Sequence, residues 1–169
     1  MIRRIARLRV PLGFVFGIVA LWLAQPTPQT LAWGAVVAIA GELVRIWAAG
    51  HLEKGREVTR SGPYHWMPHP LYVGSIVLAL GVVMAAGSAV VAVIAAVYLG
   101  TTLTAAIRSE EAFLRQTFGD TYDRYRESRA EPMPRRFSVE RVMRNREYRA
   151  VCGLFAGLAL LALKAYWLL

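Results

Sequence analysis

The chain has 169 residues, of which 56% are hydrophobic, and a formal net charge of +9. This length fits one domain, and this apolar content is high for a soluble protein. The basic residues lie in segments beside long apolar runs, a distribution that argues against nucleic-acid binding and favours contact with anionic membrane lipid. The one cysteine, Cys152, lies in an apolar run, so no disulfide can form within the chain.

The apolar runs predict an all-α integral membrane protein with about five crossings. No charged residue occurs from Leu71 to Ile107, a run too long for one soluble core helix and long enough for two crossings of about 17–20 residues each. The small residues just before Ser88 mark the turn of a tight helical hairpin over 70–107, with Ser88 as a helix cap. The expected crossings are 11–26, 31–50, 70–86, 88–107 and 149–168.

The basic residues predict the orientation of these crossings. Eighteen of the 20 lysines and arginines precede the first crossing or lie in the segments 51–69 and 108–149, and none lies in the turns 25–30 and 85–88. The positive-inside rule then places the N-terminus in the cytoplasm and the C-terminus outside. The first crossing is interpreted as an anchor and not as a cleaved secretory signal, because it offers no clean small-residue cleavage site.

Two features inside the crossings stand out. Glu42 and Arg45 lie three residues apart in the second crossing, where charged groups are costly unless they are paired. They are therefore either a structural ion pair or groups that line a pocket. Gly74 and Gly81 lie seven residues apart on the third crossing, a spacing that favours close helix packing.

The segment 62–74 joins the second and third crossings and contains three prolines, two histidines and two tyrosines. Pro70 suits the first turn of the third crossing, so His69 is expected at or just before its N-cap. Taken alone, the segment is also compatible with an entry loop whose aromatic rings lie at the level of the lipid headgroups. The histidines, cysteine and carboxylates of the chain do not have metal-ligand spacing, so no metal is expected.

The segment 108–149 is too long for a simple connection. The fourth crossing is expected to continue past the membrane surface, to carry Glu110 and Glu111 out of the lipid and to stop at Gly119. A short helix is expected next, and the residues before the last crossing are basic and amphipathic, as in a helix on a membrane surface. The segment is thus expected to form a helical cover on the cytoplasmic side, although the two glutamates alone also fit a solvated helix turn.

Four motifs follow one another around the predicted hairpin: Gly62-Pro63-Tyr64, His69-Pro70-Leu71-Tyr72-Val73-Gly74, Glu110-Glu111-Ala112-Phe113-Leu114 and Phe118-Gly119-Asp120-Thr121-Tyr122-Asp123-Arg124-Tyr125. Together they resemble the superfamily of integral membrane enzymes that includes isoprenylcysteine carboxyl methyltransferases and phospholipid methyltransferases. The resemblance covers about residues 45–130. At one position the sequence departs from it: Pro68 stands where the family has an arginine, whose role must be lost or fall to another group, such as His65, Arg60 or Arg45.

The resemblance implies S-adenosylmethionine as the methyl donor and a lipophilic acceptor that enters from the membrane. An acidic pair suits the cofactor ammonium, a helix N-terminus suits its carboxylate, and tyrosine rings suit its adenine or ribose. The implied cofactor contacts are Tyr64, His69, Tyr72, Gly74, Glu110, Glu111 and Tyr122. The predicted catalytic residues are Arg45, Glu111 and Arg126. Arg45 and the cluster of Arg124, Arg126 and Arg129 could attract an anionic acceptor head, and an arginine within a crossing is costly unless it has a partner or a task.

Two other functions stay open from the sequence. One is a related membrane reductase with a nicotinamide cofactor, and the other is a non-catalytic membrane partner that kept the fold but lost the arginine replaced by Pro68. The sequence leaves the acceptor open among lipophilic carboxylates, amines and thiols, and it does not indicate an oligomeric state.

Overall fold

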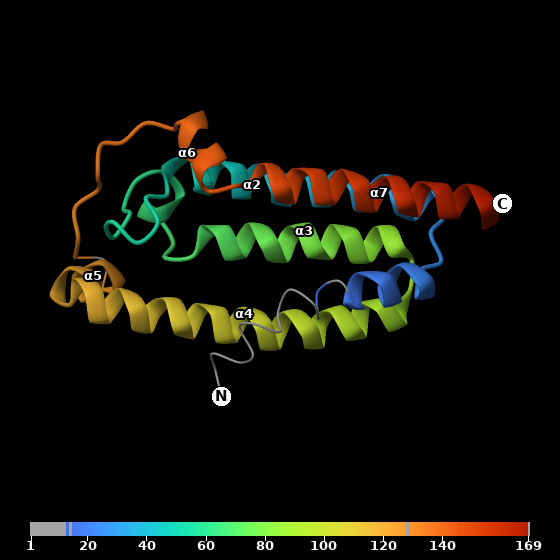
Figure 1. Cartoon of the computed structure of the whole chain (residues 1–169), viewed down its shortest axis with the longest axis horizontal. Helices are drawn as coiled ribbons and strands as arrows, with labels where there is room; N and C mark the ends of the chain where they lie inside the picture. Colours follow the sequence, from blue (N-terminus) through green and yellow to red (C-terminus); the bar gives the residue numbers. More distant parts are fainter. Residues whose placement is uncertain (1–12, 14, 128, 169) are drawn as a thin grey trace.

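The computed structural model describes residues 13, 15–127 and 129–168, and its regular elements in this part of the chain are all helical (Figure 1). The described part of an N-terminal helix covers 15–23. The elements that follow are α2 (Pro28–His51), the 3-10 helix η1 (Gly62–His65), α3 (Pro70–Ala86), α4 (Ala89–Phe118), α5 (Asp120–Arg126), α6 (Val139–Arg144) and α7 (Tyr148–Leu168). The long helices run along the molecule, and η1, α5 and α6 gather at one end, called here the loop end (Figure 1).

The described helices confirm an all-α fold with membrane-spanning character. Three of them, α2, α4 and α7, are long and apolar enough to cross a membrane. The apolar α3 has 17 residues, which is the short limit of about 17–25 residues for a crossing. The expected first crossing, 11–26, lies partly outside the described residues, as do the arginines that precede it.

The helix ends confirm the turn chemistry predicted from the sequence. Pro70 is the first residue of α3, and His69 is its N-cap, without a side-chain cap bond. Gly87 ends α3 in the left-handed region with φ 60°, and the Ser88 hydroxyl accepts from a backbone N–H of α4 at 3.5 Å. The α4 helix runs for 30 residues and stops at Gly119, so the hairpin and the extension of its second helix beyond a membrane crossing are both present.

The amphipathic helix before the last crossing is shorter than the basic pattern predicts. Its regular part, α6, has six residues and ends at Asn145. Arg146 then takes φ 62°, a conformation that an α-helix cannot continue. The chain therefore turns between α6 and α7 and does not join them in one surface helix.

Glycines allow α2 and α3 to pack with their backbones in contact. A methyl group added to Gly81 would lie 2.1 Å from the nitrogen of Ala38, and one added to Gly41 would lie 2.2 Å from the nitrogen of Leu78. Gly74 lies at the same interface, where an added methyl group would be 2.9 Å from the Gly41 carbonyl oxygen. Such small-residue contacts hold helices together in lipid, which supplies little hydrophobic driving force between them. Gly74 and Gly81 therefore have the packing role that their spacing favours.

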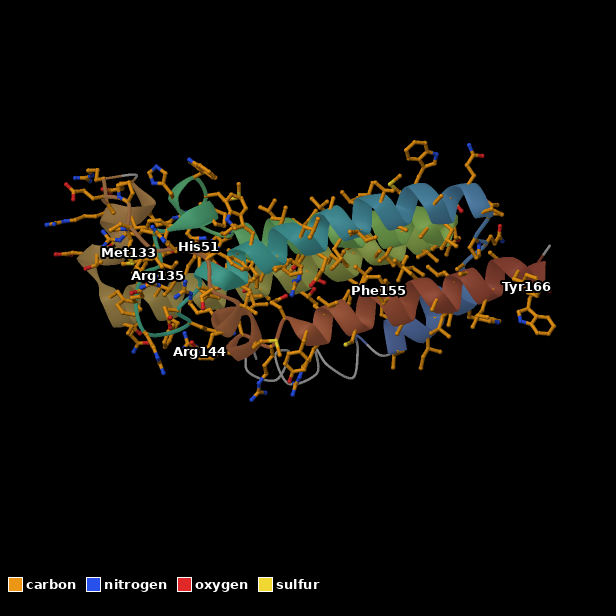
Figure 2. All side chains as sticks on the ribbon, turned by 90° about the horizontal axis from the view of Figure 1, so that it is seen from above. His51, Met133, Arg135, Arg144, Phe155 and Tyr166 are labelled. Atoms are coloured by element: carbon orange, nitrogen blue, oxygen red, sulfur yellow. The ribbon has the colours of Figure 1, made fainter. Side chains whose placement is uncertain are left out.

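The N-terminal helix is attached to α7 at the end opposite the loop end. The Lys164 ammonium donates to the carbonyl oxygens of Leu21 at 2.8 Å and Trp22 at 2.7 Å. These carbonyls belong to the last turn of the N-terminal helix, where they have no partner within the helix. Exposed aromatic side chains, as at a membrane interface, occur near this end: Trp22, Trp33, Tyr166 (Figure 2) and Trp167.

We expect Gly81→Leu to lower the thermal stability of the detergent-solubilised protein strongly. A leucine at this position must separate α2 from α3, and overpacking of a well-packed interface costs about 1–3 kcal/mol or more. Gly100 on α4 is the matched control, because an added methyl group there meets nothing within 4 Å. The measurement is the midpoint of thermal unfolding by circular dichroism, and equal midpoints for Gly81→Leu and Gly100→Leu would contradict the packing role.

Candidate functional site

Two adjoining cavities lie toward the loop end of the bundle. The first, called here the loop cavity, measures about 530 Å³ and is lined by the loop that follows α2, by η1 and the start of α3, and by α4 and α5. The second, called here the helix cavity, measures about 550 Å³ and lies between α2, α3 and α4, with Gly13 at its border. Both cavities are lined by Lys54, Tyr72, Thr102 and Ala106, so they meet at these residues.

Among the described residues, the loop cavity contains one carboxylate and one ammonium group without charged partners. Glu110 is half-buried on α4, and Lys54 is exposed in the loop after α2. Among the described residues, neither side chain has an ion pair or a hydrogen bond. The other two glutamates of the lining are paired with arginines: Glu53 lies 2.6 Å from Arg144, and Glu57 lies 2.5 Å from Arg135. The charges left over for a ligand are therefore those of Glu110 and Lys54.

Tyrosines form the wall of the loop cavity that faces α5. The Tyr125 hydroxyl donates to the Tyr64 carbonyl oxygen at 2.7 Å and to that of Met67 at 3.3 Å, which ties α5 to η1. Burial raises the pKa of both Tyr64 and Tyr125 above the ordinary value, so both rings are neutral at physiological pH. Tyr125 was not among the predicted site residues, although it is the last residue of the fourth motif.

Tyr122 lies beside this wall and does not line the cavity. It is 1% exposed, and its ring packs 6.3 Å from that of Tyr125. Its hydroxyl is buried without a hydrogen-bond partner among the described residues. An unpaired buried hydroxyl costs free energy. In this position Tyr122 packs behind Tyr125 and supports the cavity wall without lining it.

Glu111 belongs to a separate cluster and is not part of the cavity lining. Its Oε1 lies 3.2 Å from His69 Nε2 and 3.2 Å from a guanidinium nitrogen of Arg126. Neighbouring residues on a helix point about 100° apart, which is why Glu110 and Glu111 face different surroundings. The His69 ring packs 5.7 Å from that of Tyr72, so the cluster contacts a residue that lines both cavities.

Arg45 lines the helix cavity and also takes part in a buried ion-pair cluster. Its Nε lies 3.3 Å from Glu42, its Nη2 donates to Glu147 at 2.8 Å, and its Nη1 donates to Ser75. Glu42 is 4% exposed and Glu147 is 5% exposed. The ion-pair interpretation that the sequence left open applies to both Glu42 and Arg45, and the pocket-lining interpretation applies to Arg45 alone. Two carboxylates compensate its charge, which leaves little of it for an anionic ligand.

The loop 52–59 supplies much of the loop cavity and was not predicted to belong to the site. Its sequence alternates charges within Glu-Lys-Gly-Arg-Glu, a pattern that by itself indicates only a solvated connection. In the structure the backbone N–H of Glu53 donates to the Thr59 hydroxyl at 3.2 Å, which closes the loop on itself. Hydrogen bonding to Glu57 raises the pKa of Arg135, so this guanidinium stays charged.

Comparisons with known proteins agree with this arrangement. Over 87 residues the chain is 33% identical to the protein-S-isoprenylcysteine O-methyltransferase of Schizosaccharomyces pombe, and the match covers 52% of this chain and 37% of that relative. The chain thus matches well under two thirds of the length of that relative. No solved structure matches the chain.

The sequence model of the phospholipid methyltransferase family matches residues 30–121, which run from the first turn of α2 to the start of α5. This range is more than half of the chain, and it contains most residues that line the two cavities. With the first three motifs, the helical hairpin and most of the cavity lining inside the matched range, the chain belongs to the phospholipid methyltransferase family.

Proposed function

We propose that this chain transfers a methyl group from S-adenosylmethionine to a lipophilic acceptor at the membrane interface. Membership of the family supports methyl transfer. The observation that carries the proposal is that a cavity with charged groups at the loop end and a cavity between membrane helices meet at Tyr72 and Thr102. A polar donor and a lipophilic acceptor need separate compartments that join where the reacting atoms meet, because the reaction depends on their alignment.

The side chains of the loop cavity fit the charged groups of this cofactor. Glu110 would bind its ammonium group and Lys54 its carboxylate, and neither residue has to give up an ion pair to do so. The rings of Tyr64 and Tyr125 would pack against the adenosine. A cavity of about 530 Å³ is within the usual range for a small-molecule site. When bound, the cofactor supplies an electrophilic methyl group on sulfur.

The helix cavity supports an acceptor that is already an anion. Its apolar lining includes Leu71, Leu99 and Leu103, which suit a hydrocarbon chain. Among the described residues that line it there is no carboxylate or imidazole to take a proton from an amine or a thiol. A carboxylate acceptor needs no base. We therefore propose a lipophilic carboxylic acid, in line with the O-methyltransferase name of the fission-yeast relative.

The remaining predicted residues have supporting roles in this proposal. Glu111 and Arg126 hold His69 at the start of α3, which places Tyr72 against both cavities. Arg45 joins α2 to Ser75 of α3 and to Glu147 before α7, so it fixes the floor of the helix cavity. These residues then position the groups that touch the ligands.

We also propose that the loop end faces the cytoplasm, with the cofactor entering from water and the acceptor from the bilayer. The basic residues gathered at this end support that orientation. With Cys152→Ala as the background, an impermeant maleimide applied to intact cells should label Gln29→Cys at the opposite end and should label Arg136→Cys only after permeabilisation. The reverse labelling pattern would refute the orientation.

We expect Glu110→Gln to weaken binding of S-adenosylmethionine by about ten- to a hundredfold. A hydrogen bond to a charged group contributes about 1.5–3 kcal/mol, and about 1.4 kcal/mol corresponds to a factor of ten in affinity. Calorimetric titration measures the effect, with Glu131→Gln as the control, because Glu131 lines neither cavity. If the parent protein binds NADPH and not S-adenosylmethionine, the reductase alternative replaces this proposal.

We expect Leu103→Trp to raise the KM for a lipophilic acid and to leave cofactor affinity unchanged, because Leu103 lines only the helix cavity. Transfer of a radiolabelled methyl group to isoprenoid or fatty acids of increasing chain length measures this, and kcat/KM should rise with chain length. Val97→Trp is the matched control, since Val97 is 63% exposed on the same helix. Preference for short, water-soluble acceptors or for amines would contradict the proposed acceptor.

A further inference from the structure

The segment 133–145, called here the strap, lies across the end of α2 and beyond the range that the family model matches. The last carbonyl groups of an α-helix have no partner within the helix. Strap side chains satisfy these groups at the end of α2: Asn145 donates to Ala49 at 2.9 Å and to Leu52 at 3.0 Å, Arg141 donates to Gly50 at 2.6 Å, and Arg135 donates to His51 at 3.4 Å. The strap therefore caps α2 and fixes the point from which the loop 52–59 departs.

The strap backbone follows the same path. The Ser138 N–H donates to the Gly50 carbonyl oxygen at 3.1 Å, and the Met133 N–H donates to the Arg60 carbonyl oxygen at 3.4 Å. The Phe137 ring covers Gly50 so closely that a methyl group there would lie 2.2 Å from a ring carbon. The strap is thus attached on both sides of the loop 52–59.

Two ion pairs then connect the strap to the loop itself. Arg135 holds Glu57 with both ends of its guanidinium, at 2.5 Å and 2.9 Å, and Arg144 lies 2.6 Å from Glu53. A bidentate arginine–carboxylate pair fixes orientation as well as distance. Arg135 and Glu57 are only 20% and 28% exposed, so solvent screens this pair less than a surface pair. Figure 2 shows Met133, Arg135 and Arg144 with His51 at this end of the molecule.

We infer that the strap positions the wall of the loop cavity and that Arg135 is its principal positioning residue. Glu53 and Glu57 both line the cavity, and the loop that contains them includes Gly55 at φ 71°, a residue with wide conformational freedom. Arg135 also neutralises Glu57, which keeps Glu110 as the carboxylate available to a ligand. That the ligand of this wall is S-adenosylmethionine rests on the proposed function.

The test compares Arg135→Met with Arg115→Met. Arg115 also forms an ion pair, at 3.3 Å to Asp123, but both partners are exposed and neither lines a cavity. In the absence of any ligand, amide hydrogen exchange in peptides covering 50–60 should become about tenfold faster in Arg135→Met, with α2–α3 interface peptides unchanged. Arg115→Met should exchange like the parent. Arg135→Lys keeps the charge and loses the bidentate hydrogen bonding, so its exchange rate in these peptides should lie between those of Arg135→Met and the parent.

With both substrates present, Arg135→Met should raise the KM for S-adenosylmethionine about tenfold and change kcat and the acceptor KM by less than twofold. Unchanged exchange in 50–60, or equally faster exchange in all peptides, would overturn the inference, as would faster exchange with unchanged cofactor affinity. If the parent binds no S-adenosylmethionine, the proposed function fails. The exchange measurement then still tests the inference. Faster exchange confined to 50–60 would support a strap that positions the cavity wall for another ligand.

Discussion

The backbone contact between α2 and α3 is the constraint on which the rest of the structure depends. Glycines on both helices let the two helix backbones come into contact. Lipid offers no hydrophobic force between helices that would replace this packing. Because the end of α2 and the start of α3 are then side by side, the connection between them has to fold back over the end of the bundle. That connection forms one wall of the loop cavity. The longer α4 does not share this close contact, and the helix cavity lies along its side.

Charge compensation divides the acidic groups near the site into two kinds. Glu42, Glu53, Glu57, Glu111 and Glu147 each lie within ion-pair distance of an arginine. These pairs hold segments of the chain in place: α2 to the residue before α7, the loop to the strap, and α4 to α5. Such partly buried pairs contribute more to geometry than to net stability, because desolvation offsets much of their attraction. Glu110 has no such partner in the part of the chain that the structure describes, so its carboxylate is better suited to bind a cationic ligand.

The features of this structure that depend on residues close together in the sequence could be predicted from the sequence. The prolines and glycines at helix ends, the Ser88 cap and the hairpin follow from local chemistry, and the order of the four motifs indicated the family. The sequence could not separate Glu110 from Glu111, since only the direction of α4 relative to α3 and α5 distinguishes them. It also could not show that Glu147 pairs with Arg45, because these residues are 102 positions apart. The strap was predicted only as a surface segment, since its partners at the end of α2 are backbone carbonyls, which leave no mark in the sequence. The ligand roles of the site residues stay predictions.

Lys164 gives the first helix a dependence on the last. The N-terminal helix is made before α7, but the ammonium group that satisfies its final carbonyls comes from α7, 142 to 143 positions later in the chain. Until α7 is inserted, those carbonyls lack the Lys164 ammonium as a partner, and unpaired backbone groups next to lipid are costly. The N-terminal helix is therefore secured to the bundle only once α7 has been inserted, and a chain that stops before α7 would leave this helix without its attachment.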